Sequence, residues 1–221
     1  MLTPHQVTFD GPSKPVSVHA GTNAFCALMD GGSLTCWGRN ENGELGLGNT
    51  TSQDTPVALS LPSGRTVTSV SLGKNFMCVS YDNGSVACTG VNGDHQLGTG
   101  GTTEASTLQH VVGLDTDAIG VDVAQKVGCA HLTNGSVVCW GKDEWGVFGN
   151  STTSYGTSNP RDAPTATEYV AFPTGRTAAS ISVGSRQACA VLDNGDLACW
   201  GRNHKGQLGL GNATQQFMPV V

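Results

Sequence analysis

The sequence predicts an all-β protein, a β-propeller built from four repeats of about 50 residues with four short antiparallel strands in each. Three observations predict this fold. Eight cysteines form four pairs, and the two members of every pair stand ten positions apart. The first members stand at 26, 78, 129 and 189, so the same unit returns after 52, 51 and 60 residues. Short apolar runs and glycine-rich turns fill each unit, with almost no helical periodicity.

Composition permits a packed core and argues against two kinds of partner. Hydrophobic residues make up 38% of the 221 residues, and 31 residues are glycine. The formal net charge is −6, and the Lys and Arg residues are scattered along the chain without a run. A nucleic-acid surface needs clustered basic residues, so we expect no nucleic-acid partner. No stretch approaches the roughly 18 apolar residues of a membrane helix, so we expect no membrane insertion.

Each repeat opens with a short β-rich run that ends five positions before its first cysteine. Three of the runs end in glycine and the third ends in Ala124; they cover residues 16–21, 67–73, 119–124 and 179–184. No change in composition marks a second domain, so we expect a single propeller segment. Its repeats run approximately over 16–58, 67–112, 118–170 and 178–221, and residues 1–15 complete a neighbouring repeat.

A β-hairpin with a cysteine on each arm follows every opening run. The hairpin centres are the triplets 30–32, 82–84, 133–135 and 193–195, and each triplet ends in glycine. They suit a three-residue loop, in which a type I turn is followed by a left-handed glycine. Counting outward from Gly31 places Cys26 directly opposite Cys36, at a Cα separation of about 4.5 Å if the pair is not hydrogen-bonded. We therefore expect four disulfides: Cys26–Cys36, Cys78–Cys88, Cys129–Cys139 and Cys189–Cys199.

Zinc binding and redox catalysis are the alternatives for paired cysteines. Zinc ligand pairs usually stand two to four residues apart on one knuckle, which does not fit a ten-residue spacing across a hairpin. Redox catalysis needs a close Cys-x-x-Cys arrangement, which the sequence lacks. The spacing favours structural disulfides, and we expect no metal and no cofactor.

A glycine-rich loop and a short final strand complete each repeat. The loops lie at 43–49, 95–100, 146–150 and 206–212. Proline marks the final strand in Thr55-Pro56-Val57, Ala163-Pro164-Thr165 and Met218-Pro219-Val220, which suits an outer edge where no ladder donor is needed. The third repeat carries extra residues around 154–161, which we expect to form a surface loop.

One pattern returns through the chain: a Val-x-Val-x-x-Gly strand, a turn at Asp-Gly or Asn-Gly, then Cys-Trp-Gly, Gly-Gln-Leu-Gly and a Pro-Val strand. The fourth repeat shows it most fully, from Cys199-Trp200-Gly201 to Gly206-Gln207-Leu208-Gly209. In this pattern the chain resembles the regulator of chromosome condensation repeat family over nearly its whole length. The cysteine pairs look like the variant of these repeats found in exported and surface proteins.

The resemblance implies a β-propeller, usually of seven blades. Four repeats fall short of that number, so three arrangements stay open. The chain is part of a longer protein, or two chains complete a ring, or four blades close a ring alone. Fold by itself does not fix function.

Aromatic residues and variable loops are the candidates for contacts. Trp37, Trp140 and Trp200 follow their cysteines at equivalent places, and this recurrence favours packing between blades. Trp145 occurs once, inside a loop, where an aromatic residue can anchor a partner or pack locally. Equivalent loops of a propeller lie around one face. We expect any partner surface there, on Asn40, Glu41, Asn92, Asp94, His95, Asp143, Glu144, Trp145, Asn203, His204 and Lys205.

We therefore predict a non-catalytic protein-binding module whose rigid blades display variable loops, with a protein partner and possible self-association to complete a ring. Paired cysteines indicate an oxidising compartment, so we expect an extracellular or cell-surface location, although the chain opens without a signal peptide. A cytoplasmic location is the alternative. Two other functions stay open: a propeller-type lyase or hydrolase with a central-channel site, and an exchange factor-like regulator of a small GTPase. No paired carboxylates or spaced histidines nominate a catalytic site, so we expect no enzyme activity.

Overall fold

The computed structural model describes residues 5–151, 159–165 and 168–221, and these residues form four sheets of four antiparallel strands each. The first sheet contains β1 (Pro15–Ala20), β2 (Ala24–Met29), β3 (Leu34–Gly38) and β4 (Gln53–Ala58). The second contains β5 (Val67–Leu72), β6 (Phe76–Tyr81), β7 (Val86–Gly90) and β8 (Ala105–His110). The third contains β9 (Ala118–Ala124), β10 (Val127–Leu132), β11 (Val137–Asp143) and β12 (Asn159–Arg161). The fourth contains β13 (Ala178–Val183), β14 (Gln187–Leu192), β15 (Leu197–Gly201) and β16 (Gln216–Val220).

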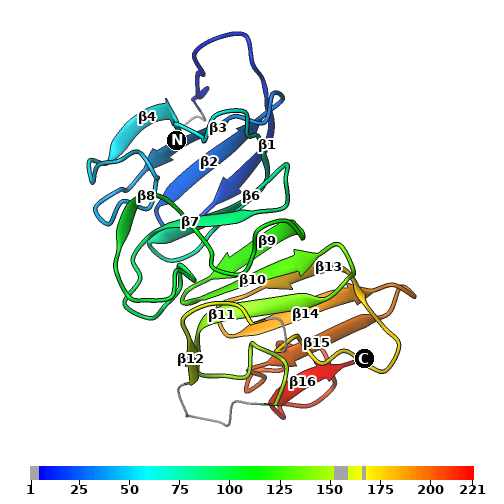
Figure 1. Cartoon of the computed structure of the whole chain (residues 1–221). Helices are drawn as coiled ribbons and strands as arrows, with labels where there is room; N and C mark the ends of the chain where they lie inside the picture. The colour runs from blue at the N-terminus through cyan, green and yellow to red at the C-terminus, as the bar shows by residue number, and fades with distance from the viewer. Residues whose placement is uncertain (1–4, 152–158, 166–167) are drawn as a thin grey trace.

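The sheets follow one another in chain order as successive blades of a β-propeller, and the described ends of the chain lie at opposite ends of the stack (Figure 1). The first strand of each sheet packs against the first strand of the next, so β1, β5, β9 and β13 form the inner side. The fourth strands form the outer edge. The predicted all-β propeller architecture of four repeats is therefore confirmed.

Each hairpin has the register that the turn predicts. Cys26 lies directly opposite Cys36, and the same holds for the pairs at 78 and 88, 129 and 139, and 189 and 199. Gly32 takes the left-handed conformation with φ of 74°, which a residue with a Cβ adopts only with strain. All four expected disulfides are present, each with a Cα separation of 4.1 Å.

Three apolar cores lie between the sheets, one at each contact. We call these contacts the first, second and third interfaces, between sheets one and two, two and three, and three and four. Leu34, Leu45 and Met77 belong to the first core. Phe76 and Trp140 belong to the second, and Phe148 and Trp200 to the third. The disulfide of each of the first three sheets belongs to the core that faces the next sheet.

The fourth strand of the third sheet differs from the prediction. We expected Ala163-Pro164-Thr165 to pair, but β12 is formed by Asn159–Arg161, which pairs with Gly141, Lys142 and Asp143. The strand therefore overlaps the segment 154–161 that was expected to be a surface loop, and the rest of that segment lies outside the described residues. The side chain of Arg161 gives a physical reason why residues 159–161, and not 163–165, pair with β11. It is 7% exposed and donates to the carbonyl oxygen of Cys139 at 2.9 Å, which fixes this segment against β11.

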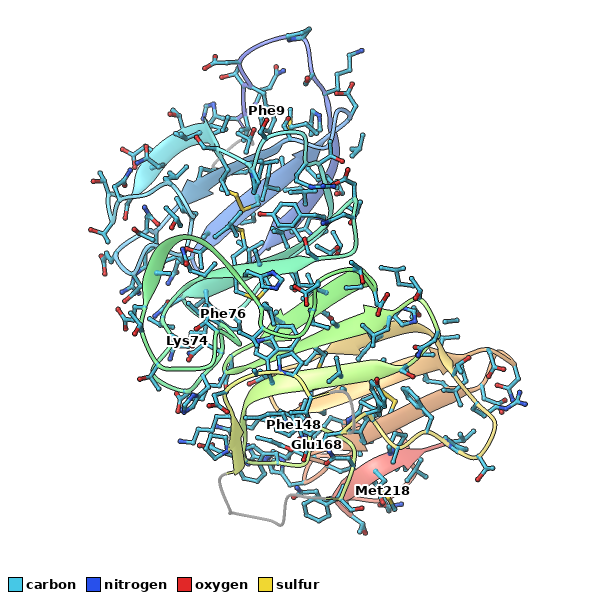
Figure 2. All side chains as sticks on the ribbon, in the orientation of Figure 1. Phe9, Lys74, Phe76, Phe148, Glu168 and Met218 are labelled. Carbon is cyan, nitrogen blue, oxygen red and sulfur yellow. A yellow bond between two sulfur atoms is a disulfide. The ribbon has the colours of Figure 1, made fainter. Side chains whose placement is uncertain are left out.

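The two terminal sheets each keep one face that no other sheet covers among the described residues. Leu197 is 56% exposed on the fourth sheet, while its equivalents Leu34, Val86 and Val137 are fully buried at the interfaces. At the other end, Val18 on β1 is 64% exposed. Phe9 lies on the segment that precedes β1, at the outer end of the first sheet (Figure 2).

Candidate functional site

An open groove of about 680 Å³ follows the inner strands, where a propeller enzyme would carry its site. Its charged lining residues are Lys74 and Asp122. The carboxylate of Asp122 is occupied by structure: it accepts hydrogen bonds from the Ser71 hydroxyl at 2.7 Å and from the backbone N–H groups of Val123 and Val183 at 3.0 and 2.7 Å. Asp122 of the third sheet is therefore hydrogen-bonded to the second and fourth sheets as well as to its own. Among its described lining residues, the groove holds no pair of groups placed for acid–base chemistry.

All the predicted partner residues lie at one end of the sheets, in connections between strands or, for Asp143, at the last position of β11. We call this end the loop end; it contains the connections from first to second and from third to fourth strands. The opposite end, with the tight turns between second and third strands, is the hairpin end. The basic residues that are scattered in the sequence gather at the loop end. Seven of the eleven Lys and Arg residues lie there: Arg39, Lys74, Lys126, Lys142, Arg186, Arg202 and Lys205.

Four of the predicted residues support their own loops. Asn40, Asn92, Asp143 and Asn203 are 0% exposed and occupy equivalent positions. The side chain of each accepts a hydrogen bond from the backbone N–H five residues later, as Asn92 Oδ1 does from Leu97 at 2.9 Å. The three asparagines also donate from Nδ2 to carbonyl oxygens further along the loop. Their side chains hold the glycine-rich loops in shape and are buried beneath the loop surface.

The other predicted residues reach the surface to different degrees. Glu41, His204 and Lys205 are exposed, while Asp94, His95, Glu144 and Trp145 are half-buried. Glu41 forms an ion pair with Arg39 at 2.6 Å. These seven residues come from all four loops. The structure does not bring them into one cluster, but it does join some of them at the interfaces.

Asp94 is the centre of an ion-pair network at the second interface. Its carboxylate contacts Lys126 Nζ at 3.0 Å and Lys142 Nζ at 3.3 Å, and Lys142 also contacts Glu144 at 2.9 Å. Desolvation favours the protonated form, but the hydrogen bonds and charges of the two lysines outweigh it and lower the pKa of Asp94. Positive charge at this interface is therefore balanced within the protein.

Trp145 is the centre of a different arrangement at the third interface. The guanidinium carbon of Arg202 lies 4.2 Å from the centroid of the indole ring, and that of Arg186 lies 5.1 Å away. His204 and Lys205 follow in the same loop of the fourth sheet. Partial desolvation and the charges of Arg202, Lys205 and Arg186 lower the pKa of His204. The charge contribution to this shift comes from three cations of the fourth sheet.

Sequence reasoning omitted Arg186 and Arg202 from the candidate residues. Arg202 directly follows Trp200-Gly201, which is a repeat motif, and Arg186 lies in a short connection far away in sequence. Lys126 and Lys142 occupy the equivalent positions one repeat earlier. This recurrence of two basic residues could have identified Arg186 and Arg202 from the sequence. No group of three or more His, Cys, Asp or Glu side chains is placed to hold a metal ion in the described part of the chain. The same residues contain no helix that is long and apolar enough to cross a membrane.

Comparison with known proteins gives two kinds of match. Residues 31–80 match a family model described as "Regulator of chromosome condensation (RCC1) repeat". Residues 16–44 and 178–207 match a second model with the same description. Ultraviolet-B receptor UVR8 of Arabidopsis thaliana is 28% identical over 210 residues, which is 94% of this chain and 46% of that protein. The human E3 ubiquitin-protein ligase HERC2 is 27% identical over 207 residues, which is 92% of this chain and 4% of HERC2.

Solved structures show the same fold. The crystal structure of human WBSCR16 superposes with a TM-score of 0.82 at 21% identity, over 98% of this chain and 54% of that one. The structure of Prp20p from Saccharomyces cerevisiae, described with its binding properties to Gsp1p and histones, gives 0.78 at 21% identity, over 94% and 51%. The chain therefore spans about half the length of UVR8 and of these two propellers.

Proposed function

Because the chain belongs to the regulator of chromosome condensation repeat family, we propose that it is a non-catalytic protein-binding module that uses the loop end of its propeller blades. The observation that carries this proposal is the contrast between buried and exposed residues in one set of loops. The buried residues Asn40, Asn92, Asp143 and Asn203 fix the loops from inside, while the less buried residue two positions later differs in every repeat, as Asn42, Asp94, Trp145 and Lys205. Rigid loops with variable outer residues are suited to selective recognition, because little ordering entropy is lost on binding.

Site-specific photo-crosslinking tests this proposal. A photoreactive amino acid replaces Glu41 or His204 at the loop end, and Asn83 or Asn194 in the exposed turns of the hairpin end as matched controls. Each oxidised variant is incubated with proteins of its own source and irradiated. We expect one protein to be joined from the loop-end positions and not from the controls. Equal crosslinking from both ends, or from the hairpin end alone, contradicts the proposal.

We also propose that further blades of the same repeat type cover the two open faces. Leu197 and Val18 support this. The equivalents of Leu197 are buried at the interfaces, and the equivalents of Val18 are buried at two interfaces (Val70 and Val121) and half-buried at the third (Ile181). Large exposed apolar faces are uncommon on proteins that work alone. The blades come from a longer chain or from a second copy. Native mass spectrometry of the 221-residue chain separates these sources, since self-association gives a dimer and a longer chain leaves the segment monomeric.

An oxidising, extracellular or cell-surface location is part of the proposal. Its support is the four disulfides, because such bonds persist mainly outside the reducing cytosol. Intact mass after alkylation of the freshly isolated, non-reduced protein tests it. No alkylated cysteine is expected, whereas eight alkylated thiols in the native source would contradict it.

An exchange factor-like regulator of a small GTPase is the second candidate function. It is favoured by the similarity to Prp20p, whose structure is described with binding to Gsp1p. Nucleotide-release assays on small GTPases from the same source separate the two candidates. Accelerated release, together with reduced cysteines in the native protein, would favour the exchange factor.

A further inference from the structure

The second and third interfaces share one architecture at the loop end but carry different side chains in it. Asp94 and Trp145 occupy equivalent positions, two residues after the buried Asn92 and Asp143 that hold their loops. Lys126 and Arg186 are equivalent too, because the carbonyl oxygen of each accepts a backbone hydrogen bond from the residue that follows the Cys-Trp-Gly motif of its sheet. That donor residue is Lys142 at the second interface and Arg202 at the third.

At the second interface a carboxylate lies between two cations. Lys126 and Lys142 both contact Asp94, and Lys142 also contacts Glu144. At the third interface an indole ring takes the position of the carboxylate, and two arginines take the positions of the lysines. The protein thus repeats the cationic part of the network without repeating its anion.

Among the described residues, no carboxylate forms an ion pair with the cations of the third interface. Arg186, Arg202 and Lys205 occur in none of the ion pairs formed by the described residues. The remaining residues, 1–4, 152–158 and 166–167, contain no Asp or Glu. The imidazole of His204 lies close enough to these three cations for their charges to lower its pKa. Basic groups that form no ion pair with the described carboxylates therefore gather around one half-buried aromatic ring, while Asp143, the nearest buried carboxylate, accepts backbone N–H groups of its own loop.

Backbone contacts hold this cluster in place. Arg202 donates its N–H to the carbonyl oxygen of Arg186 at 2.8 Å. Gly201 between them has φ of 99°, and a Cβ there would lie 2.6 Å from the same carbonyl oxygen, so glycine permits the close approach. On the other side, Gln215 Nε2 donates to the carbonyl oxygen of Trp145 at 2.7 Å. The third and fourth sheets thus both anchor the cluster.

We infer that the cluster of Trp145, Arg186, Arg202, His204 and Lys205 is a docking site for an acidic segment of a partner protein. Carboxylates of that segment pair with the two guanidinium groups, in the role that Asp94 plays one repeat earlier. This inference rests on the proposed protein-binding function and specifies one site and one ligand chemistry for it.

The chemistry of the cluster favours a peptide with carboxylates. Guanidinium groups bind carboxylates through two parallel hydrogen bonds, which adds geometric selectivity to the charge attraction. Trp and Arg are also the residues that most often dominate binding energy at protein interfaces. A long polyanion fits less well, because nucleic-acid binding requires many phosphate contacts and the whole chain has a net charge of −6.

Fluorescence anisotropy with defined probes tests the inference. The probes are a short labelled peptide with Asp and Glu interspersed with Leu and Phe, the same peptide with Asn and Gln in place of the acids, a phosphoserine peptide and a single-stranded DNA oligonucleotide. We expect the acidic peptide to bind and the neutral peptide not to bind. Arg186→Gln combined with Arg202→Gln should weaken binding by about tenfold or more, because both paired charges are lost.

Two further variants make the test specific. Arg65→Gln combined with Arg176→Gln removes the same charge from the hairpin end, where these residues pair with Asp82 and Asp193, and should leave binding unchanged. Trp145→Asp copies the second interface, supplies the missing carboxylate and should abolish binding without unfolding, as checked by circular dichroism. Equal loss in the Arg65→Gln and Arg176→Gln control, no effect of the Arg186→Gln and Arg202→Gln pair, or a clear preference for phosphopeptide or DNA overturns the inference.

The outcome is distinguishable from failure of the proposed function. If the acidic peptide does not bind but Glu41 still crosslinks to a partner, the loop end binds proteins and this site is wrong. If neither binds, the protein-binding function itself is contradicted.

Discussion

The indole Nε1 of Trp140 donates a hydrogen bond to the carbonyl oxygen of Gln96 at 2.9 Å, across the second interface. The third interface repeats the contact, from Trp200 to the carbonyl oxygen of Val147 at 2.7 Å. At the first interface the Thr89 hydroxyl donates to the carbonyl oxygen of Gly43 at 2.9 Å. A side chain in one sheet thus bonds to the glycine-rich loop of the preceding sheet at every interface.

Replacing Trp140 by Phe should reduce the free energy of unfolding by about 1–3 kcal/mol, because the buried Gln96 carbonyl loses its donor and a gap opens in the core. Urea unfolding measures this change. Trp37→Phe is the matched control. Trp37 is half-buried on the open face of the first sheet and packs against Phe9 and Phe25, so a smaller loss is expected. Equal losses would contradict the interface role.

Alanine substitutions at two glycines in equivalent loops distinguish the cost of backbone strain from the cost of a clash across an interface. Gly98 and Gly209 have φ of 66° and 72°, so alanine strains both backbones alike. A Cβ at Gly98 would lie 2.9 Å from the Trp140 ring, whereas nothing lies within 4 Å of one at Gly209. Gly98→Ala should therefore lower the thermal midpoint more than Gly209→Ala. The reverse order would contradict the assigned packing.

The buried asparagines should be among the most sensitive polar positions. Asn92 accepts from Leu97 N–H and donates to the carbonyl oxygens of Gly101 and Thr103. Asn92→Ala should cost about 2–4 kcal/mol of unfolding free energy, since several buried groups lose their partners. The control Asn194→Ala, in an exposed hairpin turn, should cost much less. Chemical denaturation of both variants measures the difference.

The disulfide of the fourth sheet should be reduced first in the folded protein. Cys189 is half-buried, whereas the other seven cysteines are buried, because its side of the fourth sheet has no covering sheet. Brief treatment with a water-soluble phosphine, followed by alkylation and peptide mapping, should label Cys189 and Cys199 ahead of the others. Uniform labelling would show that the exposed face does not control access.

The ion pairs of Asp94 should stabilise the protein only above strongly acidic pH. Its pKa lies below the usual 3.8, so the stabilisation is present above that value and is lost as the pH falls through the folded-state pKa. Asp94→Asn should therefore cost about 1 kcal/mol or less at neutral pH, since the partners are partly exposed, and almost nothing at pH near 2. Urea unfolding at the two pH values measures this. A pH-independent cost would contradict the ion-pair origin.

The repeat, the hairpin turns and the cysteine pairing could be predicted because each depends on residues close in sequence. The loop Asp30-Gly31-Gly32 determines which residues lie opposite one another, and this places Cys26 opposite Cys36. The last strand of the third sheet was mispredicted, because the proline at 164 resembled the strand motif while Arg161, a buried cation, determines the pairing.

The site was only partly predictable, because its residues meet across interfaces. Asn92 was predicted to lie in a partner-binding loop. Its side chain instead turns into the loop, where it is buried and accepts a hydrogen bond from the N–H of Leu97. Arg186 and Trp145 are 41 positions apart and meet because successive sheets stack. Contacts of this kind follow from the rotation between blades, which no single repeat encodes.

The four disulfides have a consequence for how the chain matures. Each bond joins residues ten positions apart within one hairpin, and none crosses from one sheet to another. Each pair can therefore oxidise as soon as its own hairpin has been synthesised, without waiting for later repeats. We therefore expect oxidation to follow the order of the repeats, with few wrong connectivities, when the chain enters an oxidising compartment during synthesis.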